Sequence, residues 1–238
     1  MAITTGDERA AEIAVDHGKN SLMLASIASV AAITFALIVA YGHRLSRGPV
    51  TAIAAKLAGL GYALPGTVLG VGLLIPLLWL DFKINDLTLW LFDEQVGLVL
   101  YGTLFALILG YQTRFLGVAL AMIESAFGRV KPSLDDAART LGASRLRLVL
   151  RVHIPMLRAS VLAAGLLVFV DVIKELPATL MLRPFNFETL AVRTYQLASD
   201  ERLEQAALSA LLIIAIGLIP VVILTVLMTG NKRNTPAS

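Results

Sequence analysis

The chain has 238 residues, 57% of them apolar and 16% charged, which is too apolar a composition for an ordinary soluble domain. It has no cysteine, so disulfide frameworks, thiolate metal sites and cysteine nucleophiles are excluded. The net charge of +3 would indicate a nucleic-acid partner only if the basic residues formed one exposed patch, and here they sort by membrane side instead.

Five stretches are apolar enough to cross a bilayer, whose hydrocarbon core of about 30 Å requires about 20 helical residues. They are Ser21–Tyr41, Gly61–Leu80, Val96–Arg114, Ala159–Leu182 and Ala206–Met228. Little sequence remains for a separate soluble domain. We therefore predict an all-α, polytopic membrane helical bundle over 21–229, with about five transmembrane helices, a preceding segment 1–20 and a tail 230–238.

The basic residues predict the orientation of these spans. Loops 42–60 and 115–158 and the tail hold twelve Lys and Arg, whereas 1–20, 81–95 and 183–205 hold six. Lys and Arg accumulate in cytoplasmic loops, so the amino terminus is predicted outside and the tail in the cytoplasm. An outside amino terminus with an odd number of spans leaves two alternatives, a further span upstream in a longer protein or an acidic leader that translocates unaided.

The second and third spans each contain one informative residue. Pro65 removes a backbone hydrogen bond and predicts a kink, which we interpret either as a functional hinge or as an inert bend. Arg114 is predicted to lie at the inner boundary, where its side chain would reach the lipid headgroups.

The long basic loop 124–158 contains two predicted helices. In the first, Ser133–Leu141, Ser133 is expected as the N-cap, two acidic residues occupy the first turn, and Gly142 ends the helix. The second, Ser144–His153, leads into the fourth span through Ile154-Pro155. One interpretation is an amphipathic segment that rests on anionic headgroups.

The spacing in this loop supports a more specific interpretation. From Asp136 the order is acid-Ala-Ala, three residues, Gly142, nine residues and Val-x-Ile-Pro. This resembles the cytoplasmic signature loop of permease subunits of bacterial binding-protein-dependent ABC importers, where the pattern is Glu-Ala-Ala, three residues, Gly, nine residues and Ile-x-Leu-Pro. The three differences conserve charge or shape.

The resemblance implies a bacterial inner-membrane permease whose coupling helix sits in a groove of a cytoplasmic ATP-binding subunit. It further implies a second permease half and an extracytoplasmic substrate-binding protein, for which 184–205 is the candidate docking loop or else an ordinary solvated loop. The chain has no phosphate-binding Gly-rich motif with Lys-Ser/Thr, so we expect no directly bound cofactor and ATP hydrolysis in the partner, with no catalytic residue here. The residues implied to couple the two subunits are Asp136, Ala137, Ala138, Gly142 and Pro155.

The fourth span contains a charged cluster. Asp171, Lys174 and Glu175 are spaced to share one helical face, which is costly in a bilayer unless it faces a cavity or a partner. With Pro177 they are candidates for the translocation pathway or its gate; bracing of the helix and an interfacial position are the alternatives.

The segment Lys174-Glu175-Leu176-Pro177-Ala178-Thr179 resembles the iron(III) branch of these permeases. The histidines are dispersed, so no metal site is expected (His17, His43 and His153). Other cargoes remain open: a polyamine, thiamine, a phosphonate or an oxyanion. Two further hypotheses are a secondary transporter in which Asp171 and Glu175 relay protons, and a scaffold that transports nothing.

Overall fold

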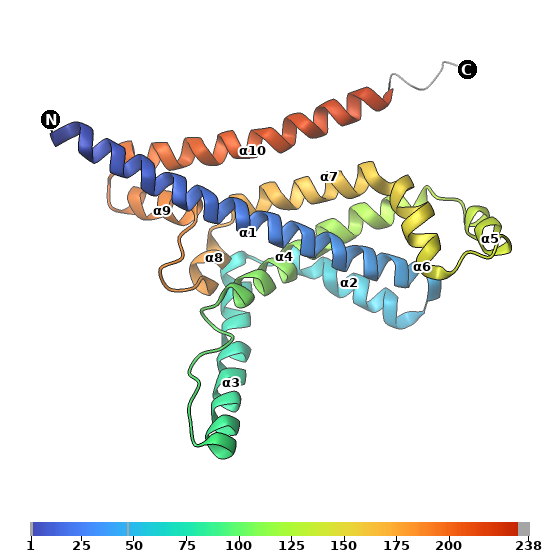
Figure 1. Ribbon diagram of the computed structural model, residues 1–238, viewed down its shortest axis with the longest axis horizontal. Coiled ribbons are helices and arrows are strands. Elements are labelled where there is room, and N and C mark those ends of the chain that lie inside the picture. Colours follow the sequence, from blue (N-terminus) through green and yellow to red (C-terminus); the bar gives the residue numbers. More distant parts are fainter. Residues whose placement is uncertain (1, 47, 233–238) are drawn as a thin grey trace.

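The structure, a computed structural model, describes residues 2–46 and 48–232. Met1, Arg47 and the tail residues 233–238 lie outside the described residues. The described part is helical, with no strand in it (Figure 1). Its helices are α1 (Ala2–Ser46), α2 (Pro49–Ala63), α3 (Gly66–Phe92), α4 (Leu104–Gly128), α5 (Pro132–Thr140), α6 (Arg145–Leu148), the π-helical turn η1 (Val149–His153), α7 (Ile154–Ile173), α8 (Pro177–Leu182), α9 (Leu190–Ser199) and α10 (Leu203–Lys232).

Five helical stretches in the described residues have the length and apolar character of membrane spans, which confirms the predicted fold class. They are Glu12–Arg44, Gly66–Phe92, Leu104–Gly128, Leu146–Ile173 and Leu203–Val226. The predicted first and fifth spans match them closely, the second ends too early, and the fourth is displaced because α7 begins before Ala159 and ends at Ile173. The third is displaced, because the first part of Val96–Arg114 is not helical.

Alanines bring α1 into the centre of the bundle. A stripe with three- and four-residue spacing is buried along the helix, formed by Ala25, Ala28, Ala32, Ala36 and Ala40. These residues belong to the same buried cluster as side chains of α4 and α7. Small side chains let helices approach closely in a membrane, where van der Waals packing replaces the hydrophobic effect as the driving force. Accordingly α1 runs alongside α4 and α7 (Figure 1).

The predicted loop 42–60 is largely the helix α2, which packs on α4. Two glycines allow this contact. A Cβ on Gly61 would overlap the carbonyl oxygen of Thr113, and one on Gly117 would lie 2.6 Å from that of Ala58. The helix ends before Pro65, since proline disfavours helical geometry in the preceding residue. The expected kink is therefore a complete break between α2 and α3.

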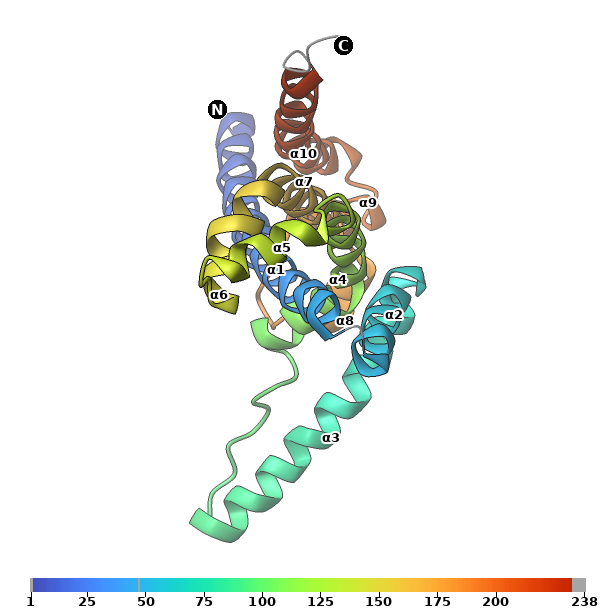
Figure 2. The same ribbon diagram turned by 90° about the vertical axis from the view of Figure 1, so that its right-hand side faces the viewer.

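Helix α3 points away from the bundle, and the chain returns beside it to α4 (Figures 1 and 2). Asp81 attaches the returning segment to the helix. Its carboxylate accepts hydrogen bonds from the backbone N–H groups of Val99, Leu100 and Tyr101 at 2.8–3.0 Å. Asn85 adds a reciprocal pair of bonds with Gly97. The predicted outer loop 81–95 is therefore mostly helix, because helix α3 continues to Phe92.

Helix α4 extends beyond the predicted third span. It begins after Thr103, whose side chain accepts a hydrogen bond from Ala106 N, and it continues to Gly128. Arg114 is consequently an interior position of the helix, and the prediction that it marks the inner boundary is wrong.

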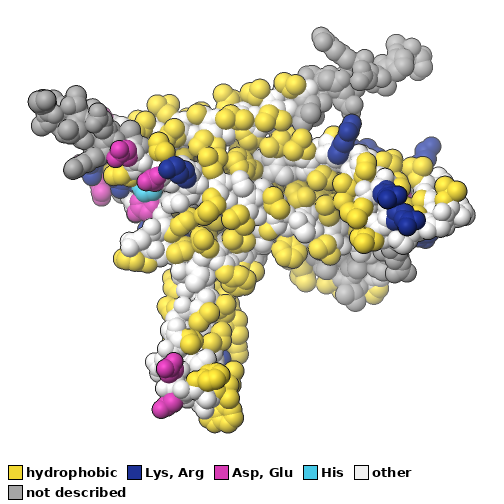
Figure 3. Space-filling model, viewed as in Figure 1, with side chains coloured by type: hydrophobic (Ala, Val, Ile, Leu, Met, Phe, Trp, Pro, Cys, Tyr) yellow, Lys and Arg dark blue, Asp and Glu magenta, His cyan; other side chains and the backbone are white. Residues whose placement is uncertain are grey.

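Charged residues gather at opposite ends of the molecule (Figure 3). Lys and Arg predominate on the visible face around α5 and α6, whereas Asp and Glu, with some Lys and Arg among them, lie near the other end of the bundle and at the tip of α3. This separation agrees with the counts of Lys and Arg along the chain, although the orientation itself stays a prediction.

Candidate functional site

Helix α5 lies exposed at the basic end of the bundle (Figure 1). None of its residues is buried. Asp136 and Ala137 are exposed, and Ala138 is half-buried. The helix confirms the predicted segment at 133–141, but its N-cap is Lys131 rather than Ser133, because Pro132 begins the helix. The residues singled out by their spacing thus lie where another protein can reach them.

Gly142 makes the turn that follows α5. It has a φ of +76°, and its N–H donates to Arg139 O at 2.9 Å while Ala143 N donates to Ala138 O at 3.0 Å. Glycine reaches this left-handed conformation without a Cβ penalty. The predicted helix stop at Gly142 is confirmed.

Continuous helical structure connects the turn to the membrane. The helix α6 passes through η1 directly into α7, with Pro155 in the first turn of α7. Proline cannot donate to the carbonyl four residues earlier, and a wider π-helical turn before it absorbs this loss. Of the two helices predicted in the loop 124–158, the second is therefore continuous with the fourth span, and the Gly142 turn separates the first from it.

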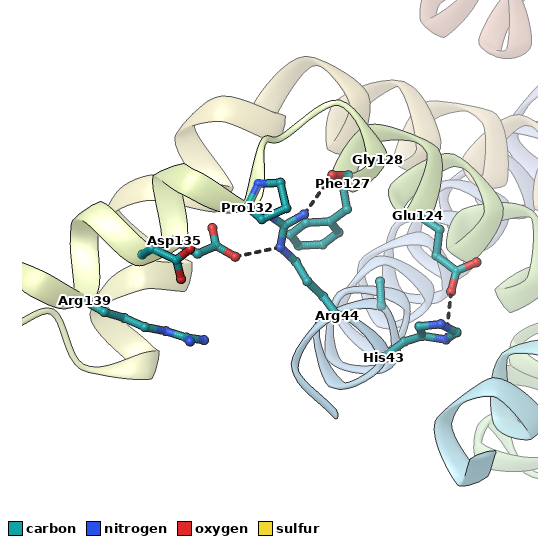
Figure 4. Close-up of a pocket in the computed structure, with 10 residues that line it drawn as sticks. His43, Arg44, Glu124, Phe127, Gly128, Pro132, Asp135 and Arg139 are labelled. Atoms are coloured by element: carbon teal, nitrogen blue, oxygen red, sulfur yellow. Dashed lines mark hydrogen bonds and ion pairs between the residues drawn. The ribbon is translucent and has the colours of Figure 1, made fainter. Parts of the chain in front are cut away.

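An ion-pair cluster lies behind α5 (Figure 4). Arg44, in the last turn of α1, donates from Nε to Asp135 Oδ2 at 2.9 Å. Its other two nitrogens donate to the carbonyl oxygens of Phe127 and Val130 at 2.9 and 3.0 Å. His153 Nε2 lies 2.8 Å from Asp135 Oδ1. Since an ionised carboxylate only accepts, Nε2 carries the proton.

The environment keeps Asp135 ionised. Burial by itself would raise the pKa of Asp135, but the hydrogen bonds from Arg44 and His153 outweigh it and hold the pKa below the ordinary aspartate value. The sequence suggested only that Asp135 interacts with the helix dipole. No local signal could have revealed the cluster, because Arg44 is 91 residues away in the chain.

An open groove of about 750 Å³ separates α5 from the ends of α1 and α4 (Figure 4). Its walls carry both signs of charge: His43, Arg44, Glu124, Asp135, Asp136 and Arg139. His43 Nδ1 and Glu124 Oε1 face one another across 3.8 Å.

A second polar cluster surrounds Glu175. Its Oε2 lies 3.2 Å from Arg114 Nε, and its Oε1 accepts a hydrogen bond from Ala178 N at the start of α8. Arg114 Nη1 also donates to Leu64 O at 2.9 Å, at the break between α2 and α3. The expectation that Arg114 reaches the headgroups is therefore wrong, because its guanidinium has partners within the fold. Pro177 begins α8 beside this cluster.

Asp171 and Lys174 pair separately from Glu175. Lys174 Nζ lies 3.0 Å from Asp171 Oδ1. The helix α7 ends at Ile173, so Glu175 lies in the following turn and faces Arg114. The prediction that all three charges share one face is wrong, and each acid has its own basic partner. No cluster of three or more metal-ligating side chains occurs in the described part of the chain.

The chain resembles permeases of several importers. It is 24% identical over 205 residues to an Fe(3+)-transport system permease protein of Haemophilus influenzae, covering 86% of this chain and 37% of that protein. It is 30% identical over 150 residues to a sulfoquinovosyl glycerol transport system permease protein of Agrobacterium fabrum, covering 61% and 51%. The chain thus spans about a third to a half of the length of these relatives.

A solved structure has the same fold. A chain of the bacterial alginate ABC transporter, in complex with an alginate pentasaccharide-bound periplasmic protein, superposes with a TM-score of 0.63 at 16% sequence identity, over 92% of this chain and 78% of that one. Residues 23–232 match one family over most of the chain, so this multi-pass protein belongs to the binding-protein-dependent transport system inner membrane components.

Proposed function

We propose that this chain is a transport subunit that moves substrate across the inner membrane using ATP hydrolysed by a separate, cytoplasmic subunit. The observation that carries the proposal is the exposed α5, followed by the Gly142 turn and by unbroken helix into α7. A partner that displaces α5 displaces the inner end of a membrane span, because only the short turn at Gly142 separates α5 from the continuous helical segment that leads into α7.

Each coupling residue has a role in this proposal. The exposed carboxylate of Asp136 pairs with a basic residue of the ATPase, and Ala137 and Ala138 allow its surface to approach closely. Gly142 fixes the angle between α5 and α6, while Pro155 marks the point where the helical segment from α6 through η1 continues into the membrane span α7. The exposed side chains of Leu134, Leu141 and Leu146 beside them provide apolar contact area that a partner would cover.

The remaining partners are assigned by charge and position. The basic end faces the cytoplasm in this proposal, so the binding protein docks at the opposite end, where 183–205 contains α9. The alginate transporter's complex with a periplasmic protein supports such docking. A second permease half covers the exposed apolar side chains of α3 and α10, the two spans with the smallest share of buried residues among the five described spans.

We assign a gating role to the Glu175 cluster. The Arg114–Glu175 pair joins the α2–α3 break to the turn before α8, and these irregular segments are where the bundle can bend. Asp171 and Lys174 lie near the end of α7, beside an apolar groove against α10. Because Asp171 pairs with Lys174 and Glu175 pairs with Arg114, neither acid is free for the proton relay of a secondary transporter.

The proposed cargo is iron(III), delivered by the binding protein. The segment from Lys174 to Thr179 and the similarity to the Haemophilus influenzae permease support iron, whereas the sulfoquinovosyl glycerol relative keeps other small solutes as alternatives.

Reconstitution tests the proposal. Proteoliposomes that contain the permease, its ATPase and its binding protein are expected to take up labelled ferric iron only when ATP is present on the side of the bilayer that carries the ATPase. Uptake without nucleotide would contradict the ATP-coupled mechanism. ATP-driven uptake of a sugar, polyamine or oxyanion instead of iron would contradict the cargo alone.

A further inference from the structure

Within the described residues, Asp135 is the side chain of α5 that forms ion pairs with other helices. Asp135 has a side chain only 13% exposed, although no residue of α5 is fully buried. Its Oδ2 contacts Arg44 on α1, and its Oδ1 contacts His153 in η1, which leads into α7. Thus α5 lacks an apolar core of its own, and a carboxylate holds it against two membrane spans.

Both partners of Asp135 are themselves held rigidly. The Arg44 guanidinium lies 5.5 Å from the centroid of the Phe127 ring while it binds two carbonyl groups at the end of α4. The imidazole of His153 is buried between the rings of Phe127 and Tyr41, with centroids 5.3 and 5.8 Å away. Because neither partner can follow Asp135 by changing rotamer alone, a displacement of α5 must move helices.

We propose that Asp135 is a positioning residue that makes α1 and α7 move together with the coupling helix. The inference rests on the proposed coupling of α5 to an ATPase. It adds α1 to the moving parts: a force on α5 reaches one span through the covalent chain at Gly142 and η1, and a second span through Arg44. Without the carboxylate, α5 would keep its covalent connections to α4 and α7 but lose its direct contact with α1.

Spin-label distances in the complete transporter test this directly. The chain has no cysteine, so Ile38→Cys on α1 and Thr140→Cys on α5 carry the labels, diluted with unlabelled copies. With native Asp135 we expect one narrow distance distribution that is the same with and without ATP. With Asp135→Asn, which keeps the shape and removes the charge, the distribution should broaden and shift when ATP binds.

Transport provides the second readout. In Asp135→Asn we expect substrate moved per ATP hydrolysed to fall at least about fivefold, the lower end of typical coupling between sites. Asp16→Asn is the matched control, since its carboxylate pairs with Lys19 at 2.8 Å on the exposed surface, and it should leave both readouts unchanged. An unchanged distance distribution and unchanged transport per ATP in Asp135→Asn would overturn the proposal.

A second variant decides the matter if Asp135→Asn does not assemble. Arg44→Lys keeps the positive charge but cannot bind Asp135, Phe127 O and Val130 O at once, because it lacks the planar fork. It should give the same broadened distances, and native behaviour would refute the inference. Absence of ATP-driven uptake with the unmodified chain would instead refute the proposed function, so the two failures are distinguishable.

Discussion

Arg114 on α4 and Glu175 before α8 form an ion pair at 3.2 Å inside the helical bundle. Both side chains are largely covered, at 19% and 7% exposed. Arg114 also holds the carbonyl of Leu64. One guanidinium therefore connects the break in the second span to the turn that follows the fourth, and neither charge is stable there alone.

Removing one member of this pair should destabilise the fold strongly. Glu175→Gln keeps an acceptor for Ala178 N but leaves Arg114 without its counter-charge, and we expect a loss of roughly 3 kcal/mol. The measurement is thermal unfolding of the purified permease in detergent. The double variant Arg114→Leu/Glu175→Leu should lose less than the single variants Arg114→Leu and Glu175→Leu together, and strictly additive losses would contradict a direct pair.

The contact between α2 and α4 should not tolerate a methyl group at Gly61. In Gly61→Ala the new Cβ would overlap the Thr113 carbonyl, and we expect destabilisation of about 1–3 kcal/mol. Gly59→Ala is the control on the same helix. Nothing lies within 4 Å of its Cβ, so better helix propensity should make it neutral or slightly stabilising. Equal unfolding temperatures for both variants would contradict the close helix contact.

The turn at Gly142 should be sensitive to the shape of the side chain. Gly142→Val places a β-branched residue at a φ of +76°, which should reduce the population of the native turn roughly tenfold. Membrane insertion should remain normal, while ATP-driven uptake falls. Gly142→Asn is the control, because asparagine enters the left-handed region more readily. If valine supports uptake as well as asparagine, the turn is not what couples the two subunits.

The arm formed by α3 and its return segment should depend on Asp81. In Asp81→Ala three backbone N–H groups lose their acceptor, and the segment around Val99 should detach from α3. A single cysteine at Leu98 would report this as faster reaction with a maleimide. Asp86→Asn, which affects only the exposed pair with Lys83, should react at the rate of the parent. An unchanged rate in Asp81→Ala would show that other contacts hold the segment.

Local sequence features were enough to predict much of this protein. Runs of apolar residues predict membrane insertion, and the length of each run predicts a membrane-spanning helix. The α5 helix and the Gly142 stop follow from short-range chemistry, acidic residues near the start and a glycine that tolerates positive φ, although the helix begins at Pro132 and not after the predicted cap Ser133. The spacing from Asp136 to Pro155 identified the family, and the matched residues 23–232 confirm it.

Helix ends were harder to predict wherever the deciding contact was distant. The third span was placed too early because Val96–Leu100 is apolar, yet this segment is not helical, and Asp81 on α3 binds the backbone N–H groups of Val99 and Leu100. Likewise the apolar composition of α2 did not show that it would pack on α4 instead of forming part of a loop.

Charge pairing between different elements was decided by tertiary structure, whereas pairs such as Asp171 with Lys174 are local in the sequence. Asp135, Arg44 and His153 come from three elements, with Asp135 91 residues from Arg44 and 18 from His153. Glu175 follows Lys174 directly, yet its basic partner is Arg114 on another helix. Sequence determines which residues carry charge and which segments enter the membrane, because those properties are local. Which charges meet depends on how the helices pack, and only there does a costly buried charge find the partner that stabilises it.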